Sequence, residues 1–312
     1  MSGKQLAPDE AVRLAYVGKR YFLDSRSRTQ IAEELKISRF AVARLIRKAL
    51  DTGIVSISIS TPGPVDAELS IALRDRFDLD DAYVITSATE DADHLRRALG
   101  SIAAELLAAR IVDGDRLGVS SGRTLLEMSR AIGAIALCDV VQLTGVADPM
   151  REHGTEAVST LARRSGGSVY RLPAPLIVTD DAAAATIARQ PGIMQSLAQL
   201  DRLTCAVVTI GAWPEDSLLH DSLVPTGEAA ELIARGVVAE VGTTLLDADG
   251  CAVDVLDGRM IGISADQLRA APHVIGVGGG AAKHAAIASV LRAGLLSGLV
   301  TDAGTARHLL EV

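Results

Sequence analysis

The apolar positions of residues 28–52 recur at helical spacing in two short runs that three residues separate. Thr29 can cap the first helix and Ser38 the second, because a side-chain oxygen there accepts a backbone N–H. The second helix turns apolar side chains to one face and leaves a set of cations on the other: Arg39, Arg44, Arg47 and Lys48. Two short helices joined this tightly, with cations on the second, are typical of a helix-turn-helix that enters the major groove of DNA.

The pattern around this pair refines the prediction. Lys36 holds a turn position where many such motifs have Gly, since the backbone there often needs a positive φ, which Lys adopts at a modest cost. Gly53 ends the second helix, and residues 54–59 alternate like a strand, which predicts the wing of a winged domain. A helical hairpin belonging to a larger core is the alternative interpretation.

Strand-like and helix-like runs alternate beyond Thr61-Pro62-Gly63-Pro64, which breaks the pattern and marks a domain boundary. An earlier helix begins near Pro8. The expected strands are 81–85, 116–119, 139–143, 204–211, 273–277 and 299–300, with extended segments at 169–172 and 175–178 and a hairpin joining 245–246 to 251–253. The expected helices are 65–77, 91–111, 124–134, 156–165, 181–188 and 304–310. We therefore predict an α/β protein: a winged helix-turn-helix domain over residues 1–60, then a doubly wound α/β effector domain over residues 61–312.

Charge is distributed unevenly between these two regions. The 312 residues carry a net charge of −8, which at first argues against nucleic acid. Residues 1–60, however, hold eleven Lys/Arg against six Asp/Glu, a net of +5, which leaves −13 for residues 61–312. A small basic module on a large acidic body fits one DNA-contacting end.

Composition also limits the class of protein. Hydrophobic residues make up 48% of the chain, enough for a sizeable core, although aromatic residues contribute only 3%. Cys138, Cys205 and Cys251 are scattered beside aliphatic residues without metal-ligand spacing, so we expect buried thiols and no zinc site. The amino terminus lacks a signal-peptide core, and no apolar run is long enough to span a bilayer, so we expect a soluble cytoplasmic protein.

A ligand in such a sheet binds beyond the carboxyl ends of the strands, where three loops stand out, the third of them Thr301-Asp302 after the last strand. The first offers backbone N–H groups, hydroxyls and one guanidinium at the start of a helix, an anion cradle formed by Ser120, Ser121, Gly122, Arg123 and Thr124. The alternative is that these small residues only permit a tight turn. The second loop is a glycine run, residues 276–283, that ends in Lys283.

The glycine run matches neither of the common nucleotide-binding motifs. It lacks the G-x-G-x-x-G spacing, and His284 follows Lys283 where a Walker loop needs Ser or Thr. A phosphate or sugar phosphate is the better match, although Lys283 also reads as a solvated lysine. Asp302, after the last strand, suits either a helix cap or a ligand contact.

Catalytic chemistry is not recognisable in the sequence. The six histidines show no spacing for metal ligation, no G-x-S-x-G elbow is present, and no general base stands beside the anion cradle. We therefore predict no catalytic residues, metal or cofactor. A sugar-phosphate isomerase or deaminase-like enzyme with an accessory N-terminal module is the alternative.

Several segments together resemble the SorC family of bacterial transcriptional regulators over nearly the whole chain: SRFAVARLIRKALDTGIVSISI, GVSSGRTL, VVQLTG, YRLPAPLIV, LLDADG, HVIGVGGGAAKHAAI and LVTDAGTARHLL. The resemblance implies a winged helix-turn-helix, an effector domain similar to sugar-phosphate isomerases and deaminases without their catalysis, homo-oligomers that are commonly tetramers, and a phosphorylated sugar or polyol as effector. It also implies that residues 121–124 and Lys283 hold the phosphate and that Thr144 and Glu240 lie near the sugar. Glu240 stands where many members have Asp.

The predicted regulator would bind double-stranded DNA, with two modules on a palindromic operator of carbohydrate-metabolism genes. Arg39 and Arg44 are expected to reach base edges, and Thr29, Gln30 and Ser38 to contact phosphates. Phe40, next to Arg39, completes the predicted DNA-binding set. The effector would act through a difference in affinity between two assemblies, and both inducer and corepressor remain open.

Overall fold

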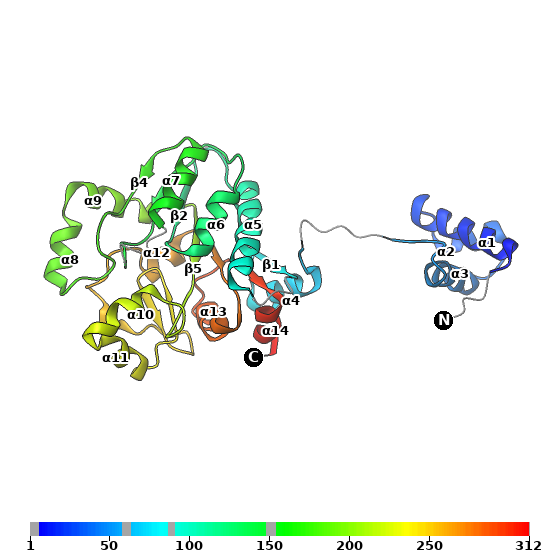
Figure 1. Ribbon diagram of the computed structural model, residues 1–312. Coiled ribbons are helices and arrows are strands. Elements are labelled where there is room, and N and C mark those ends of the chain that lie inside the picture. Colours follow the sequence, from blue (N-terminus) through cyan, green and yellow to red (C-terminus); the bar gives the residue numbers. More distant parts are fainter. Residues whose placement is uncertain (1–5, 58–63, 87–90, 148–153, 312) are drawn as a thin grey trace. The chain divides into compact units, whose positions relative to one another are not determined.

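The structure is a computed structural model that describes residues 6–57, 64–86, 91–147 and 154–311. Its internal contacts divide the chain into two compact units, residues 1–60 and residues 61–312. Both units are drawn in Figure 1.

The first unit is a group of helices packed on a small apolar core. These are α1 (Pro8–Gly18), which a π-helical turn (Lys19–Leu23) continues, α2 (Arg28–Leu35) and α3 (Arg39–Asp51). The core is formed by side chains at most 8% exposed: Val17, Ile31, Ala32, Val42 and Ile46. The predicted pair of short helices and its inward-facing residues are confirmed.

The starts of α2 and α3 show whether Thr29 and Ser38 cap these helices as predicted. Ser38 caps α3 as expected, accepting the N–H of Ala41 at 3.1 Å. Thr29 does not cap α2: the cap is Ser27, which forms a capping box with Gln30. The sequence offered two hydroxyl residues two positions apart, and the Gln three residues after Ser27 was the signal that distinguished them.

The predicted wing is not a strand where the structure describes it. Residues 54–57 adopt bends and irregular backbone, and the rest of the predicted strand lies outside the described residues. The alternating pattern was therefore misleading over these four positions, because alternation alone does not supply a partner strand.

The turn between α2 and α3 stores a small strain at Lys36, whose φ is +52°. Replacing Lys36 with Gly is expected to stabilise the first unit by about 1 kcal/mol, because Gly adopts this left-handed conformation without a Cβ penalty. Urea unfolding followed by circular dichroism measures the change. The control, Lys19→Gly at an exposed helical position with φ −58°, is expected to destabilise the unit by a similar amount. A loss of stability in Lys36→Gly would contradict the argument.

The second unit is built on a seven-stranded sheet in which every pair of neighbours is parallel. In spatial order the strands are β1 (Asp81–Ile85), β10 (Gly298–Asp302), β9 (His273–Val277), β5 (Cys205–Thr209), β2 (Arg116–Val119), β3 (Asp139–Gln142) and β4 (Val169–Tyr170). The expected strands at 81–85, 116–119 and 273–277 have the bounds that the apolar runs predicted.

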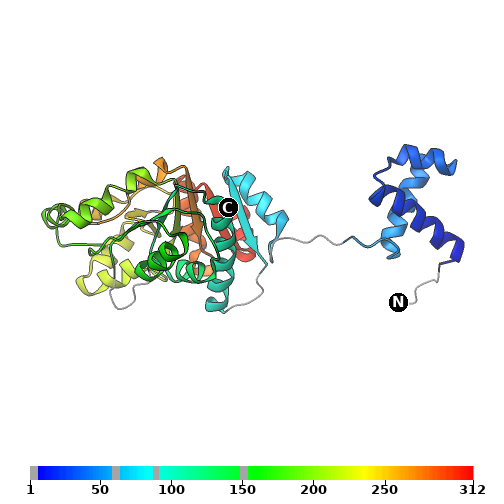
Figure 2. The ribbon, with the colours of Figure 1, turned by 90° about the horizontal axis from the view of Figure 1, so that it is seen from above.

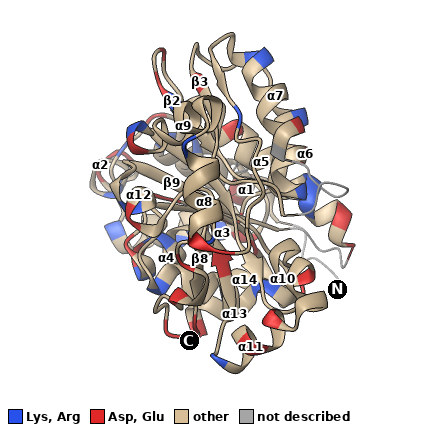
Figure 3. Cartoon of the chain, turned by 90° about the vertical axis from the view of Figure 1, so that its left-hand side faces the viewer, with Lys and Arg blue, Asp and Glu red and all other residues tan. Residues whose placement is uncertain are grey.

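Helices cover both faces of this sheet, as Figures 1 and 2 show. One face packs on α5 (Ala92–Arg110), α6 (Arg123–Ala131) and α7 (Gly154–Ser165). The other packs on α4 (Ala67–Phe77), α13 (His284–Arg292) and α14 (Ala303–Glu311). The central strands carry apolar side chains on both faces, which confirms the predicted α/β class. Charged residues lie mostly on the outer helices and loops (Figure 3).

Residues 189–270 contain elements that the sequence patterns did not show. A small antiparallel sheet is formed by β6 (Gly211–Ala212), β7 (Ala239–Val241) and β8 (Thr244–Leu246). The helices of this region that the patterns did not show are α9 (Pro191–Leu197), α10 (Leu218–Leu223), α11 (Glu228–Ala234) and α12 (Ala265–Ala270). The helix predicted over residues 181–188 is confirmed as α8 (Asp181–Ala188). The predicted strand 204–211 thus ends at Thr209, and Gly211 begins the second sheet. Residues 175–178 form isolated bridges through Pro175 and Ile177 rather than a strand.

The predicted hairpin after β8 is confirmed as a tight turn. Leu246 bridges Ala252, and the carboxylate of Asp247 accepts the N–H groups of Asp249 and Cys251 at 3.0 and 2.9 Å. Asp247 therefore serves turn chemistry rather than a ligand.

Two of the three cysteines are buried, Cys138 and Cys205, whereas Cys251 is exposed, against expectation. Burial raises the pKa of Cys205 to about 12, so its thiol stays protonated. Among the described residues, no helix has both the length and the apolar character needed to cross a bilayer. Nor does the described part of the chain bring three metal-ligating side chains together.

The order of the strands reverses between β2 and β5. From β2 the chain proceeds to β3 and β4 on one side, then returns to β5 on the other side of β2 and continues to β9 and β10. The loops at the carboxyl ends of β2 and β5 diverge at such a switch point, which leaves a crevice where ligands bind.

Candidate effector pocket and DNA-contacting helix

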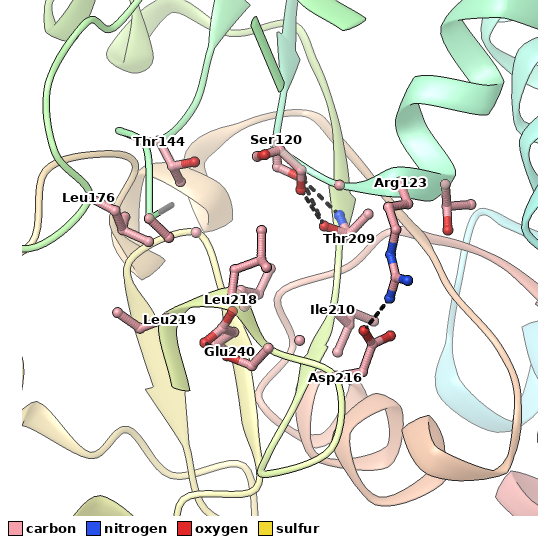
Figure 4. A pocket seen from close by; sticks show the side chains of 18 of the residues that line it. Ser120, Arg123, Thr144, Leu176, Thr209, Ile210, Asp216, Leu218, Leu219 and Glu240 are labelled. Atoms are coloured by element: carbon pink, nitrogen blue, oxygen red, sulfur yellow. Dashed lines mark hydrogen bonds and ion pairs between the residues drawn. The ribbon is translucent and has the colours of Figure 1, made fainter. Parts of the chain in front are cut away.

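A pocket of about 400 Å³ opens at this switch point. The ends of β2 and β5 form one side of it, Lys283 reaches it from beyond β9, and the small antiparallel sheet supplies another wall (Figure 4). Most of the residues proposed from the sequence line it together: Ser120, Ser121, Gly122, Arg123, Thr124, Thr144, Glu240 and Lys283. Side chains that are more than 60 residues apart in the sequence therefore share one cavity.

The amino end of α6 faces this pocket. Its N-cap is Gly122, so no side chain caps the first N–H groups of the helix, and Arg123 and Thr124 follow in its first turn. Gly122 is needed because a Cβ there would lie 2.6 Å from Cγ2 of Thr209. Backbone donors at a helix start, with a guanidinium beside them, favour an anion.

Hydroxyl groups fasten the end of β2 to the end of β5. The N–H of Thr209 donates to Oγ of Ser120 at 2.9 Å, and Oγ1 of Thr209 donates to the carbonyl of Ser121 at 2.8 Å. Ser120 is 4% exposed, so its main contribution is to hold the loop in place. The anion cradle is thereby fixed before a ligand arrives.

Two cations and one carboxylate meet in the pocket. An Nη of Arg123 lies 2.7 Å from Oδ1 of Asp216, and Nζ of Lys283 lies 3.1 Å from Oδ2. Burial alone would raise the pKa of Asp216, but the charges of Lys283 and Arg123 outweigh it and hold the pKa below its usual value. Asp216 is therefore ionised and bridges the two cations.

Glu240 lies on β7 and lines the same pocket. Its carboxylate accepts the indole N–H of Trp213 and the hydroxyl of Ser217, both at 2.7 Å. Burial raises its pKa above the ordinary value of 4.5, despite these two donors and the charge of Lys283. A carboxyl group held in this way can accept or donate hydrogen bonds to sugar hydroxyls.

The raised pKa of Glu240 gives a test through stability. A group whose pKa is higher in the folded chain contributes stability below its unfolded pKa, near 4.5, and loses it as pH rises through the folded pKa. Glu240→Gln removes that loss while its amide oxygen still accepts both donors. The variant's melting temperature is expected to exceed the wild type's at pH 8 and to match it near pH 4.5. Each kcal/mol of unfolding free energy that the variant gains raises the melting temperature by about 2–4 °C. Glu215→Gln, at an exposed neighbour, is the control, and equal melting curves at both pH values would contradict this role.

Asp302 lies outside the pocket, where it cannot contact a ligand bound there. Its carboxylate accepts the N–H groups of Gly280, Gly304 and Thr305 at 2.7, 2.9 and 3.1 Å. Of its two predicted roles, the helix cap at the start of α14 is the observed one.

The glycine run also contributes less to the pocket than the sequence suggested. The N–H of Gly278 donates to the carbonyl of Val300, and that of Gly280 to Asp302, so both are already used. A Cβ at Gly279 would lie 2.3 Å from Oδ2 of Asp302. Close packing therefore explains the glycines, and the loop's polar contribution to the pocket is Lys283.

Sequence reasoning missed the residues that come from the loop after β5. Thr209, Asp216 and Ser217 line the pocket, as does Arg96 on α5. The rule that ligands bind beyond the carboxyl ends of strands, applied to the apolar run 204–209, was the signal that could have found the first three.

The first unit presents a cationic helix surface. On α3, Arg39, Phe40 and Arg44 are exposed, and the guanidinium of Arg39 lies over the ring of Phe40 at 5.1 Å. Within the described part of this unit, Arg39 and Arg44 form no ion pair, whereas Arg20 pairs with Asp24 and Glu34. Arg39 and Arg44 therefore remain available to an outside anion, whereas Lys48 of the same helix pairs with Glu10.

The polar residues beside this surface have structural roles as well. Gln30 and Ser38 take part in the caps of α2 and α3 through their side-chain oxygens. Thr29 is exposed in the first turn of α2. Their contact with DNA phosphates stays a prediction.

Comparison with known proteins gives one family. A family model described as "Putative sugar-binding domain" matches residues 65–311. The deoxyribonucleoside regulator of Bacillus subtilis is 28% identical over 314 residues, covering 99% of this chain and 98% of the relative. The erythritol catabolism regulatory protein EryD of Brucella abortus is 27% identical over 310 residues, covering 96% of each.

A solved structure shows the same fold over almost the whole chain. The full-length sorbitol operon regulator SorC of Klebsiella pneumoniae aligns with a TM-score of 0.72 at 23% identity, covering 97% of this chain and 99% of that one. The relatives are transcriptional regulators, which confirms the expectation of a regulator rather than an enzyme. Because the family model spans most of its length, the chain belongs to the SorC family of sugar-binding transcriptional regulators, with an N-terminal DNA-binding region followed by the sugar-binding domain.

Proposed function

We propose that this regulator controls genes of carbohydrate metabolism and that a phosphorylated sugar or polyol, bound in the pocket of residues 61–312, changes its affinity for operator DNA. The relatives' names support the first part, since they include an erythritol catabolism regulator and a deoxyribonucleoside regulator. The chemistry of the pocket supports the second part.

The observation that carries the proposal is the convergence of two cations and an uncapped helix start on one cavity. Arg123 and Lys283 lie on opposite sides of Asp216, next to the first N–H groups of α6. Phosphate oxygens suit such a site because they accept several N–H bonds at once. Glu240, which lines the same cavity, offers a partner for sugar hydroxyls.

The helix α3 of the first unit supplies the DNA contact in this proposal. Arg39 and Arg44 reach base edges, Phe40 contacts thymine methyl groups, and Thr29, Gln30 and Ser38 approach phosphates. One such module makes few contacts, so two of them pair on a palindromic operator in a homo-oligomer, for which the SorC resemblance suggests a tetramer.

Thermal unfolding across a panel of sugars and polyols tests the ligand class. We expect at least one phosphorylated compound to raise the melting temperature of the full chain, because a ligand that binds only the folded state adds RT ln(1 + [L]/Kd) to its stability. The unphosphorylated form of the same compound is the matched control. If phosphorylated compounds give no more stabilisation than their neutral forms, the phosphate site is refuted.

A further inference from the structure

The carboxylate of Asp216 lies between Arg123 and Lys283, two of the three cations that line the pocket; the third, Arg96, pairs with Asp93. Each of its oxygens faces a different cation, Arg123 at 2.7 Å and Lys283 at 3.1 Å. Figure 4 shows the guanidinium of Arg123 directed at this carboxylate. The side chain of Asp216 is 32% exposed and that of Lys283 16%, so water screens this cluster only in part.

A phosphate group and Asp216 have the same requirement for positive charge. A phosphate monoester carries about −1.5 to −2 charges at neutral pH, and its oxygens accept the same N–H groups that Asp216 now accepts. Arg123 and Lys283 cannot hold both anions at once, because a phosphate beside an ionised carboxylate places like charges a few ångströms apart. One of the two anions has to leave.

The segment that carries Asp216 also contacts Glu240, which lines the same pocket. The backbone of Asp216 bonds to Ala212 in both directions, at 2.8 and 3.1 Å, which closes a tight turn. Ser217 caps α10 through the N–H of His220 and donates to Glu240, as does Trp213. Movement of Asp216 therefore disturbs the start of α10 and the hydrogen bonds of Glu240.

We propose that Asp216 is a built-in counter-ion that competes with the ligand's phosphate for Arg123 and Lys283, and that phosphate binding displaces Asp216 together with residues 212–217. This inference rests on the proposed phosphate site. It assigns to Asp216 the discrimination between phosphorylated and neutral sugars, since a neutral sugar offers no charge with which to displace a carboxylate. It also names residues 212–217 as the segment that moves when the pocket is filled.

Titration of the full chain with inorganic phosphate, at constant ionic strength set by chloride, tests the competition. In Asp216→Asn the internal anion is gone while the shape is kept, so we expect phosphate to bind about ten-fold more tightly than to the wild type. Glu231→Gln removes the same charge from an exposed position on α11, outside the pocket. Its phosphate affinity is expected to change by less than about two-fold, because Glu231 pairs with Arg235 and contacts neither Arg123 nor Lys283.

Trp213, the single tryptophan of the chain, reports the movement of the segment. Its indole donates to Glu240 and it lies three residues from Asp216, so its emission depends on where residues 212–217 lie. Phosphate is expected to shift the emission of the wild type. Asp216→Asn is expected to show part of that shift before phosphate is added, and Glu231→Gln none.

The outcomes separate this inference from the function on which it rests. If phosphate binds the wild type and Lys283→Met abolishes binding, but Asp216→Asn binds phosphate no more tightly, the site exists and the counter-ion role is wrong. Tight binding to Asp216→Asn alone, with none to the wild type, would support the inference. If phosphate binds neither protein, both the phosphate site and the counter-ion role fall.

Discussion

Replacing Lys283 with Met is expected to weaken the binding of the phosphorylated effector by roughly 10- to 100-fold, which corresponds to losing one charge-assisted hydrogen bond in a partly buried site. Lys283 is the only lysine between residues 61 and 312, and its Nζ is held in the pocket by Asp216 and by the carbonyl of Ile210. The unbranched Met side chain keeps most of the packing and removes the charge. The effector's influence on DNA should disappear with it.

Calorimetric titration with the compound that the thermal panel selects measures this loss. Arg292→Met is the matched control, because Arg292 is an exposed cation on the same region of chain, α13, and lies outside the pocket. DNA binding by Lys283→Met without effector should equal that of the wild type, since the first unit is unaltered. Normal effector affinity in Lys283→Met would remove this residue from the site.

Replacing Arg44 with Ala is expected to weaken operator binding by about 1–3 kcal/mol, while thermal stabilisation by the effector stays unchanged. Arg44 is exposed on α3, five residues after Arg39 and on the helix whose Val42 and Ile46 face the core. Because its guanidinium has no partner among the described residues, its removal leaves the unit's own contacts intact. The loss should therefore come from DNA alone.

Fluorescence anisotropy with labelled operator DNA, at several salt concentrations, measures this effect. If Arg44 reads a base, the loss should differ between operator and unrelated DNA, whereas a phosphate contact weakens both and lowers the salt dependence. Arg13→Ala is the control, because Arg13 is an exposed cation of the same unit on α1. Unchanged operator affinity in Arg44→Ala would show that α3 does not read DNA through this residue.

The regular part of the fold was predictable from the sequence. Apolar runs such as 273–277 gave strand bounds that the structure matches, because a strand buried on both faces has no polar positions that blur its ends. Helix starts were predictable where one capping residue was present, as at Ser38. Where two were close together, at Ser27 and Thr29, the choice needed the capping box.

The elements and site residues that were not predicted depend on contacts between residues far apart in the sequence. The small antiparallel sheet has strands of two or three residues, too short for any periodic pattern, and Gly211 joins it only by pairing with Glu240. Asp216 reads in the sequence as one of many loop acids, and its meeting with Arg123 and Lys283 follows from the order of the strands. Eight residues of the site were predicted, and most of them could be found because they follow directly after predicted strands.

We propose that the first unit binds DNA and that a phosphorylated ligand in the second unit changes this binding. The most direct measurement is the affinity of the full chain for DNA selected by the chain itself from a random library, with and without each phosphorylated compound and its neutral form. We predict that one phosphorylated compound changes the affinity by about five-fold or more, in either direction, and that its neutral form does not. Equal effects of both forms, or DNA binding that no phosphorylated compound alters, would contradict the claim.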